Sequence, residues 1–212
     1  GDGEDDLLVT GPGASYLLLG PVDLRGVEDV AEVADVILDD SLGRAAERLG
    51  DVTGDGLADL VFLRPTTFGD FELITIAGGN GAGVELPRVL DRAWVDEILA
   101  VDNQARVSVR TGTNGYFGDG FDLDGTALSV LNWNDDGFAD VLIAVAEGNG
   151  PIEFFGGVID GEDLWTGTGS IESSGNFLAW LYADQGDRRA VAEAVTGLSL
   201  DGSAVGRAQV LT

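Results

Sequence analysis

Short apolar segments recur along the chain and are bounded by Gly, Asp, Asn and Pro. Segments of this kind, about half a dozen residues or fewer, are typical of β-strands separated by tight turns. They predict strands at residues 7–10, 16–19, 59–63, 71–76, 106–110, 140–145 and 177–181. Residues 27–38 and 86–98 also fit helical spacing, and we interpret them as outer strands or loops. With 33 Gly among 212 residues, the pattern favours an all-β fold.

One sequence unit is repeated along the chain. An Asp-Gly turn, a further Asp and an apolar strand occur in this order three times, with the turn at Asp2, Asp55 and Asp136. The steps between these turns are 53 and 81 residues, and 78 residues lead from Asp136 through the chain end to Asp2. Residues 200–212 followed by 1–9 match residues 123–143, so we expect the last strand to pair with the first. Residues 98–104 match 178–185, which divides each long step into a full unit and a shortened one.

These repeats predict a small β-propeller closed by pairing of the N- and C-terminal strands. A closed ring of this type leaves only short, protected strand edges. At about 40 to 50 residues for each blade, residues 1–212 would form a single domain of about five blades, three full and two degenerate. Four blades is the alternative count.

Two loops, 51–59 and 132–140, carry oxygen-bearing residues at matching positions. Side-chain oxygens stand at positions 1, 3, 5 and 9, Gly stands at position 6, and position 7 offers its backbone carbonyl. Ca²⁺ takes about six to eight oxygen ligands at flexible distances, and Gly permits the sharp turn that directs them inward. We predict two Ca²⁺ sites, with the ligands Asp51, Thr53, Asp55, Leu57 and Asp59 in one loop and Asn132, Asn134, Asp136, Phe138 and Asp140 in the other.

These loops are not EF-hands, because Phe62 and Ile143 stand at position 12, where an EF-hand carries a bidentate Glu. Residues 42–65 instead resemble the FG-GAP repeat of integrin α-subunits and their bacterial relatives. Residues 11–21 are similar to the next strand of that repeat. The resemblance implies a β-propeller with Ca²⁺ in its strand-connecting loops, whereas related propellers usually have seven blades.

The remaining copies of the loop are incomplete. The N-terminal copy, with Asp2, Glu4 and Asp6, is at most a partial site. The stretch near Asp102 and residues 184–187 keep only some of the ligand positions, and we expect them to bind no metal.

Charge and missing residue types exclude several functions. The 38 acidic and 11 basic residues leave a formal net charge of −27, which disfavours nucleic acid as a partner. No apolar run reaches membrane-spanning length, so no membrane insertion is expected. The chain has no His, Cys or Lys, so it lacks the side chains that most nucleophilic catalysis uses as base or nucleophile. We therefore expect no enzymatic activity. A carboxylate glycosidase is the alternative, with candidates Glu72, Glu97, Glu153, Asp119, Asp122 and Asp163, although solvated charge is the favoured interpretation of each.

The loops also bear on where the protein works. Neutral ligands such as Thr53 and Asn132 predict weak Ca²⁺ binding, at the roughly 10⁻⁴ to 10⁻³ M of extracellular modules. We expect an extracellular or cell-surface module for adhesion or ligand binding, with an unidentified protein or glycan ligand. A monomer is expected, and a fragment completed by oligomer formation is the alternative. A lectin is the alternative function, because Trp rings stack on sugars; its candidates are Trp94, Trp133 (expected to be exposed), Trp165 and Trp180 (expected in the core).

Overall fold

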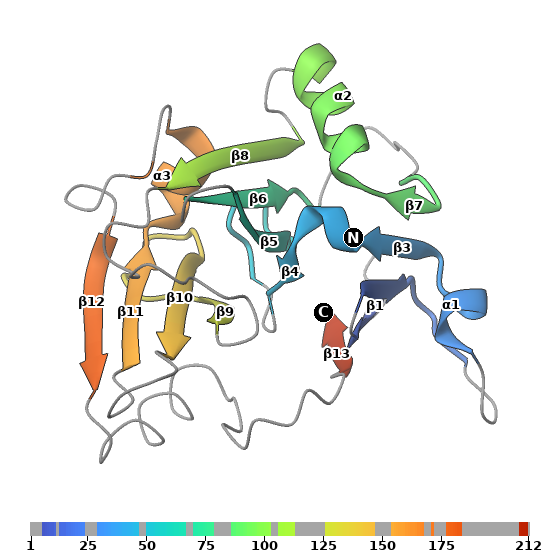
Figure 1. Cartoon of the computed structure of the whole chain (residues 1–212), viewed down its shortest axis with the longest axis horizontal. Helices are drawn as coiled ribbons and strands as arrows, with labels where there is room; N and C mark the ends of the chain where they lie inside the picture. Colours follow the sequence, from blue (N-terminus) through green and yellow to red (C-terminus); the bar gives the residue numbers. More distant parts are fainter. Residues whose placement is uncertain are drawn as a thin grey trace.

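A computed structural model gives the fold of this chain (Figure 1). It describes residues 6–11, 13–23, 29–46, 50–66, 70–78, 86–102, 106–112, 126–146, 154–167, 171, 177–183 and 208–211. Strands dominate these residues, and the all-β prediction is confirmed. In the same ranges, no helix is long and apolar enough to cross a bilayer.

The strands form three sheets, none of which closes into a barrel. The first sheet has the order β13 (Ala208–Leu211), β1 (Asp6–Gly11), β2 (Ala14–Leu18), β3 (Val36–Asp39) and β7 (Val89–Leu90). The second sheet has the order β4 (Arg44–Ala45), β5 (Leu60–Pro65), β6 (Phe71–Ile76) and β8 (Val107–Gly112). The third sheet has the order β12 (Phe177–Ala183), β11 (Phe154–Ile159), β10 (Asp140–Ala146) and β9 (Thr126–Leu131). All seven predicted strands are present.

Each of the three sheets contains a four-stranded antiparallel meander with the same strand order. Apart from the short parallel strand β7, each begins with an inner strand, β13, β4 or β9, that pairs with β1, β5 or β10. The next strand is β2, β6 or β11, and the last is β3, β8 or β12. A helix lies between the third and fourth strands of each unit: α1 (Val30–Val33), α2 (Arg92–Asp102) or α3 (Gly161–Thr166). The short helix η1 (Asp40–Leu42) follows β3.

Pairing of the terminal strands is confirmed, because β13 runs antiparallel to β1 with Asp6 opposite Leu211. The same register recurs in the third sheet, where Asp140 lies opposite Leu131. An isolated bridge between Gly50 and Asp59 takes the corresponding place in the second sheet. The repeat found in the sequence is therefore a repeat of strand pairing.

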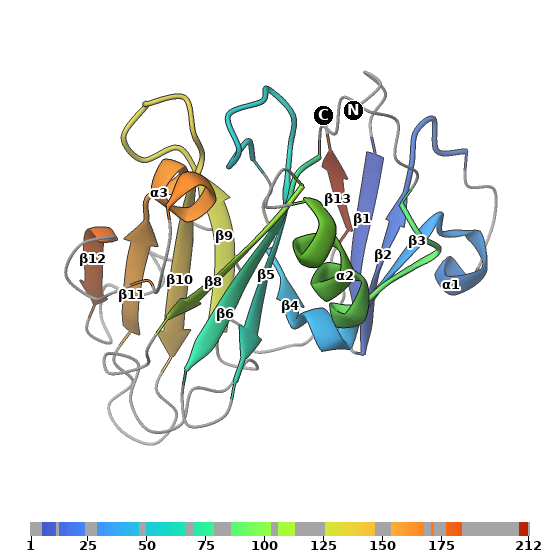
Figure 2. The ribbon, with the colours of Figure 1, turned by 90° about the horizontal axis from the view of Figure 1, so that it is seen from above.

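The second sheet is buried on both faces (Figure 2). Val61 and Leu63 of β5 point into a core shared with the third sheet. Their neighbours Leu60 and Phe62 point into a core shared with the first sheet. Successive strand residues face opposite sides, so apolar residues occupy successive positions where a strand lies between two cores, as at residues 60–63. Side chains of β6 alternate in the same way between the two cores.

Two expectations about the irregular regions are wrong in part, because each region contains a helix as well as a strand, β3 or β7. Residues 92–102 form helix α2 rather than an outer strand or loop, because Val95, Ile98 and Leu99 pack as one face against the core of the first and second sheets. Residues 27–38 contain the short helix α1 as well as the outer strand β3.

The described residues form three sheets, fewer than the four or five expected blades. The proposed match between residues 98–104 and 178–185 fails, since the former begin within α2 whereas residues 177–183 form the strand β12. In the second unit, β7 and α2 occupy part of the added length that we assigned to a degenerate repeat. Residues 184–187 lie outside the described part.

Candidate metal-binding loops

The loops 51–59 and 132–140 have the same backbone turn. Position 4 has a positive φ in both, at 77° for Gly54 and 59° for Asp135. Position 6 does too, at 88° for Gly56 and 98° for Gly137. Asp and Gly tolerate this left-handed conformation better than most residues. Two segments of different sequence thus adopt the sharp turn that the ligand spacing predicted.

Side-chain oxygens converge in the first loop. The Thr53 hydroxyl oxygen lies 3.5 Å from Asp51 Oδ1 and 3.4 Å from Asp59 Oδ1. Backbone N–H groups of Asp55 and Gly56 donate to the two Asp51 oxygens at 2.9 and 2.7 Å and hold that carboxylate in place. Positions 1, 3 and 9 of the predicted cage are therefore brought together.

Position 5 of each loop closes a local turn. Asp55 Oδ1 accepts a hydrogen bond from the N–H of Leu57 at 2.9 Å, and Asp136 Oδ1 accepts one from Phe138 at 2.9 Å. Both aspartates are exposed. These hydrogen bonds direct the position 5 carboxylates to their own turns rather than to Asp59 or Asp140 at position 9.

The second loop is less well arranged for a cation. The amide nitrogen of Asn134, rather than its oxygen, faces Asp136 Oδ2 at 2.7 Å. Asn132 Oδ1 accepts from the N–H of Asp135 at 2.7 Å. A cation at this loop requires the Asn134 amide to turn its oxygen inward. Such a rotation leaves the backbone unchanged, because only side-chain torsions are involved.

Position 9 carries a buried carboxylate in both loops, Asp59 and Asp140. Asp59 accepts N–H groups of Thr53 and Gly78, both at 2.8 Å. Asp140 accepts those of Trp133 at 2.8 Å and Gly161 at 3.0 Å. Burial raises the pKa of Asp59 to about 6 despite these hydrogen bonds, and burial also raises the pKa of Asp140.

The hydrogen bond from a glycine to the position 9 carboxylate recurs in all three sheets. Asp6, at the corresponding place in β1, accepts the N–H of Gly20 at 2.8 Å. Each donor, Gly20, Gly78 or Gly161, follows the strand that pairs with the strand of its aspartate. The aspartate therefore ties the start of one strand to the end of its neighbour. We call this contact the Asp–Gly clasp.

Two clasp glycines are fixed by close packing. A Cβ atom on Gly78 would lie 1.9 Å from the Ala58 carbonyl oxygen, and one on Gly161 would lie 2.1 Å from that of Ala139. Sequence reasoning missed both positions. The available signal was a glycine that follows the second apolar strand after each Asp-Gly loop. The segment between the position 9 aspartate and this glycine differs in length between the two copies, so the repeat did not align the two glycines.

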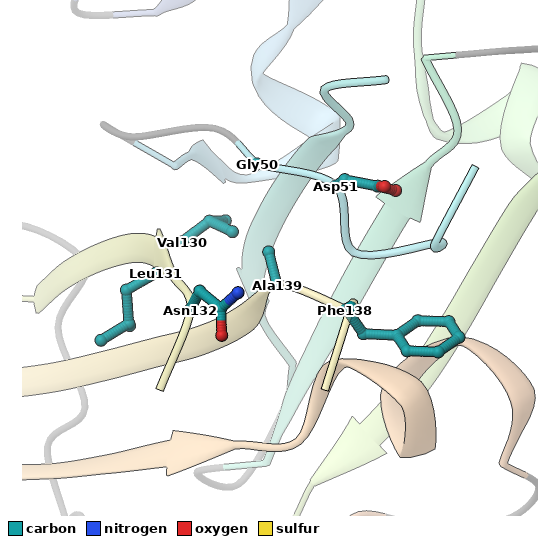
Figure 3. A pocket seen from close by; sticks show the side chains of 8 residues that line it. Gly50, Asp51, Val130, Leu131, Asn132, Phe138 and Ala139 are labelled. Carbon is teal, nitrogen blue, oxygen red and sulfur yellow. The ribbon is translucent and has the colours of Figure 1, made fainter. Parts of the chain in front are cut away.

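The two loops are in direct contact (Figure 3). The Ala139 N–H donates to the Asp51 carbonyl oxygen at 2.6 Å. The Phe138 ring lies against Gly54 so closely that a Cβ there would be 2.6 Å from the ring. A pocket of about 540 Å³ lies between the loops and is lined by Gly50, Asp51, Val130, Leu131, Asn132, Gly137, Phe138 and Ala139.

The remaining candidate carboxylates are dispersed. Glu72 pairs with Arg64 at 2.9 Å and Arg92 at 3.4 Å, so interpreting it as a solvated charge was wrong. Asp163 lies 3.7 Å from Arg110, a buried residue of β8. Glu97 is exposed on α2. Glu153, Asp119 and Asp122, together with Asp2 and Glu4 of the partial site, lie outside the described residues.

Among the tryptophans, Trp133 is 45% exposed, as predicted. Trp94 packs against the core of the first and second sheets, and Trp165 is half-buried in α3. Trp180 lies in β12, and its side chain is outside the described part of the structure.

The donor set of the first loop fits a hard cation better than that of the second. Within the described ranges, no three carboxylates converge on one point. The first loop instead combines two carboxylates with a hydroxyl, and all three groups offer the oxygen donors that Ca²⁺ prefers. A bound cation would also favour the ionised form of the buried Asp59.

Comparison with known proteins found no match among protein-family models, curated proteins or solved structures. The interpretation of the loops therefore depends on the geometry of this chain.

Proposed function

We propose that this chain is a calcium-stabilised, non-enzymatic β-propeller module of the FG-GAP type that binds a ligand outside the cell. The observation that carries the proposal is the convergence of Asp51, Thr53 and Asp59 in a loop whose backbone turn is repeated at 132–140. Ca²⁺ would connect each loop to the strand that begins at its position 9 or directly after it.

The propeller interpretation is supported by the three equivalent sheets. Each is a four-stranded antiparallel meander with one strand order, and two hydrophobic cores stack the sheets face to face. Blades of a propeller pack in this way. In this proposal the three sheets are blades of the propeller.

Weak affinity would place the module outside the cell. The second loop offers two amides and two carboxylates, and its Asn134 must rotate before it can bind a cation. Sites of low ligand charge require about 10⁻⁴ to 10⁻³ M Ca²⁺, a concentration found in extracellular fluids. A dissociation constant below about 10⁻⁶ M would contradict this assignment.

Thermal unfolding with Ca²⁺, with Mg²⁺ and with chelator tests the proposal. At 10 mM free Ca²⁺ and a dissociation constant of about 10⁻⁴ M, one site adds about 2.7 kcal/mol and raises the midpoint by roughly 5 to 11 °C. Asp55→Ala and Asp136→Ala should each reduce the rise. Asp70→Ala, which removes an exposed carboxylate outside both loops, is the matched control. Equal midpoints with Ca²⁺ and with chelator would refute the metal sites.

A carbohydrate-binding module is the second candidate, and the exposure of Trp133 favours it. Trp133 is 45% exposed and adjoins Asn132, which lines the pocket between the loops. Exposed aromatic faces stack on sugar rings. A glycan-array signal that Trp133→Ala removes, while the calcium-dependent midpoint stays the same, would support this function; an array without signal would oppose it.

A further inference from the structure

The loops 51–59 and 132–140 touch through a ligand of each predicted set, Asp51 and Phe138, and through residues beside these ligands. Asp51, position 1 of the first cage, accepts the N–H of Ala139 through its backbone carbonyl at 2.6 Å. Ala139 stands between Phe138 and Asp140, positions 7 and 9 of the second cage. The backbone that presents ligands to one cation is therefore hydrogen-bonded to the backbone that presents ligands to the other.

A second contact joins the loops at the tightest part of the first turn. The Phe138 ring packs on Gly54, whose φ of 77° sets the direction of the chain between Thr53 and Asp55. No side chain fits at Gly54 while the ring is there, since a Cβ would lie 2.6 Å from it. Ordering of Phe138 in the second loop therefore restricts the first loop.

We propose that the two loops bind Ca²⁺ cooperatively through this contact, so that a cation in one loop raises the affinity of the other. This inference rests on the proposed function. A first cation orders the shared backbone, and the second then binds a loop with less conformational freedom to lose. Linkage requires the effect to be reciprocal, and such coupling is typically about 5- to 150-fold.

Electrostatics opposes this coupling. A cation in the first loop partly neutralises Asp51, Asp55 and Asp59 and so weakens the attraction that these carboxylates exert on a second cation. The exposed carboxylates act through water and are screened by salt, with a Debye length of about 3 Å at 1 M ionic strength. The backbone hydrogen bond and the ring contact are not screened in this way, so cooperativity should persist at high salt.

Trp133 provides a reporter within one of the two loops, and D136A identifies the part of the signal that comes from that loop. It belongs to loop 132–140, whereas loop 51–59 contains no tryptophan. Tb³⁺, a luminescent substitute for Ca²⁺, is sensitised by a nearby indole, and W133F establishes which part of the signal comes from Trp133. The experiment titrates Tb³⁺ into the full chain at about 1 M salt, for the unaltered protein, D55A, F138A and D55A/F138A.

Coupling predicts that D55A shifts the Tb³⁺ midpoint of loop 132–140 by about fivefold or more. F138A changes no charge and keeps the backbone carbonyl at position 7. In a double-mutant cycle, the midpoints of F138A and D55A/F138A should therefore differ by less than about twofold. Equal midpoints for the unaltered protein and D55A would overturn cooperativity and leave the calcium sites standing. If the unaltered protein gives no Tb³⁺ signal, or if D136A leaves the signal unchanged, the proposed function is overturned instead.

Discussion

Asp59 should make the metal-free protein less stable at neutral pH than in mild acid. Its carboxyl is buried, and its pKa in the fold is about 6, against an ordinary value of 3.8. The folded state therefore holds a proton that the unfolded state releases between these values. Stability must fall as the pH rises through about 4 to 6 and level off above, and the total loss is about 3 kcal/mol.

Urea unfolding with chelator, at intervals between about pH 4 and pH 7, measures this loss. The other carboxylates also titrate here, so the readout is the difference between the unaltered protein and Asp59→Asn. The asparagine cannot ionise, and the constant cost of its altered hydrogen bonds to Thr53 and Gly78 cancels when two pH values are compared. The expected difference over this pH range is about 2 kcal/mol, because the unfolded carboxyl is already partly ionised at pH 4, and Ca²⁺ should reduce it by favouring the ionised Asp59. Parallel pH curves for the two proteins would refute the reasoning.

Three further changes test the packing. Gly78→Ala should destabilise the fold by about 1 to 3 kcal/mol in urea unfolding, because its Cβ would meet the Ala58 carbonyl oxygen at 1.9 Å; an unchanged midpoint would contradict the close contact. Phe62→Ala should cost about 3 to 5 kcal/mol, whereas Val101→Ala, at a residue 76% exposed, should stay within about 0.5 kcal/mol; similar costs for both would refute the burial assigned to Phe62. Truncation before Ala208 removes β13 and should abolish hydrogen-exchange protection of the β1 amides that bond to it, and retained protection would disprove the pairing.

Local sequence patterns determined much of the strand content. Residues 71–76 were predicted as a strand and form β6 with the same bounds. Repetition around the Asp-Gly turns also predicted that the two chain ends pair, as β1 and β13 do. The shared turn of the two candidate loops followed from glycine and aspartate at fixed positions, because a left-handed backbone is a local preference of these residues.

The helix α2 shows why the same reasoning failed elsewhere. Residues 86–98 fit both a helix and an outer strand, and the choice between them depends on which core the apolar face meets. Val95 and its neighbours cover the core between the first and second sheets, which a helix at residues 92–102 can do. The length of the second unit was misinterpreted for a related reason, because α2 and β7 occupy part of the length assigned to a degenerate repeat.

By itself, the sequence determined seven of the strands, the three-fold repeat, the pairing of the chain ends and the turn of each candidate loop, because these features depend on residues close together or on repeated patterns. Only the tertiary structure decided that the second sheet is buried on both faces, that Gly20, Gly78 and Gly161 clasp the position 9 aspartates, and that Asp51 meets Ala139. These contacts join residues far apart in the chain. Their distances depend on how whole sheets stack, for which hydrophobic periodicity within one strand carries no information.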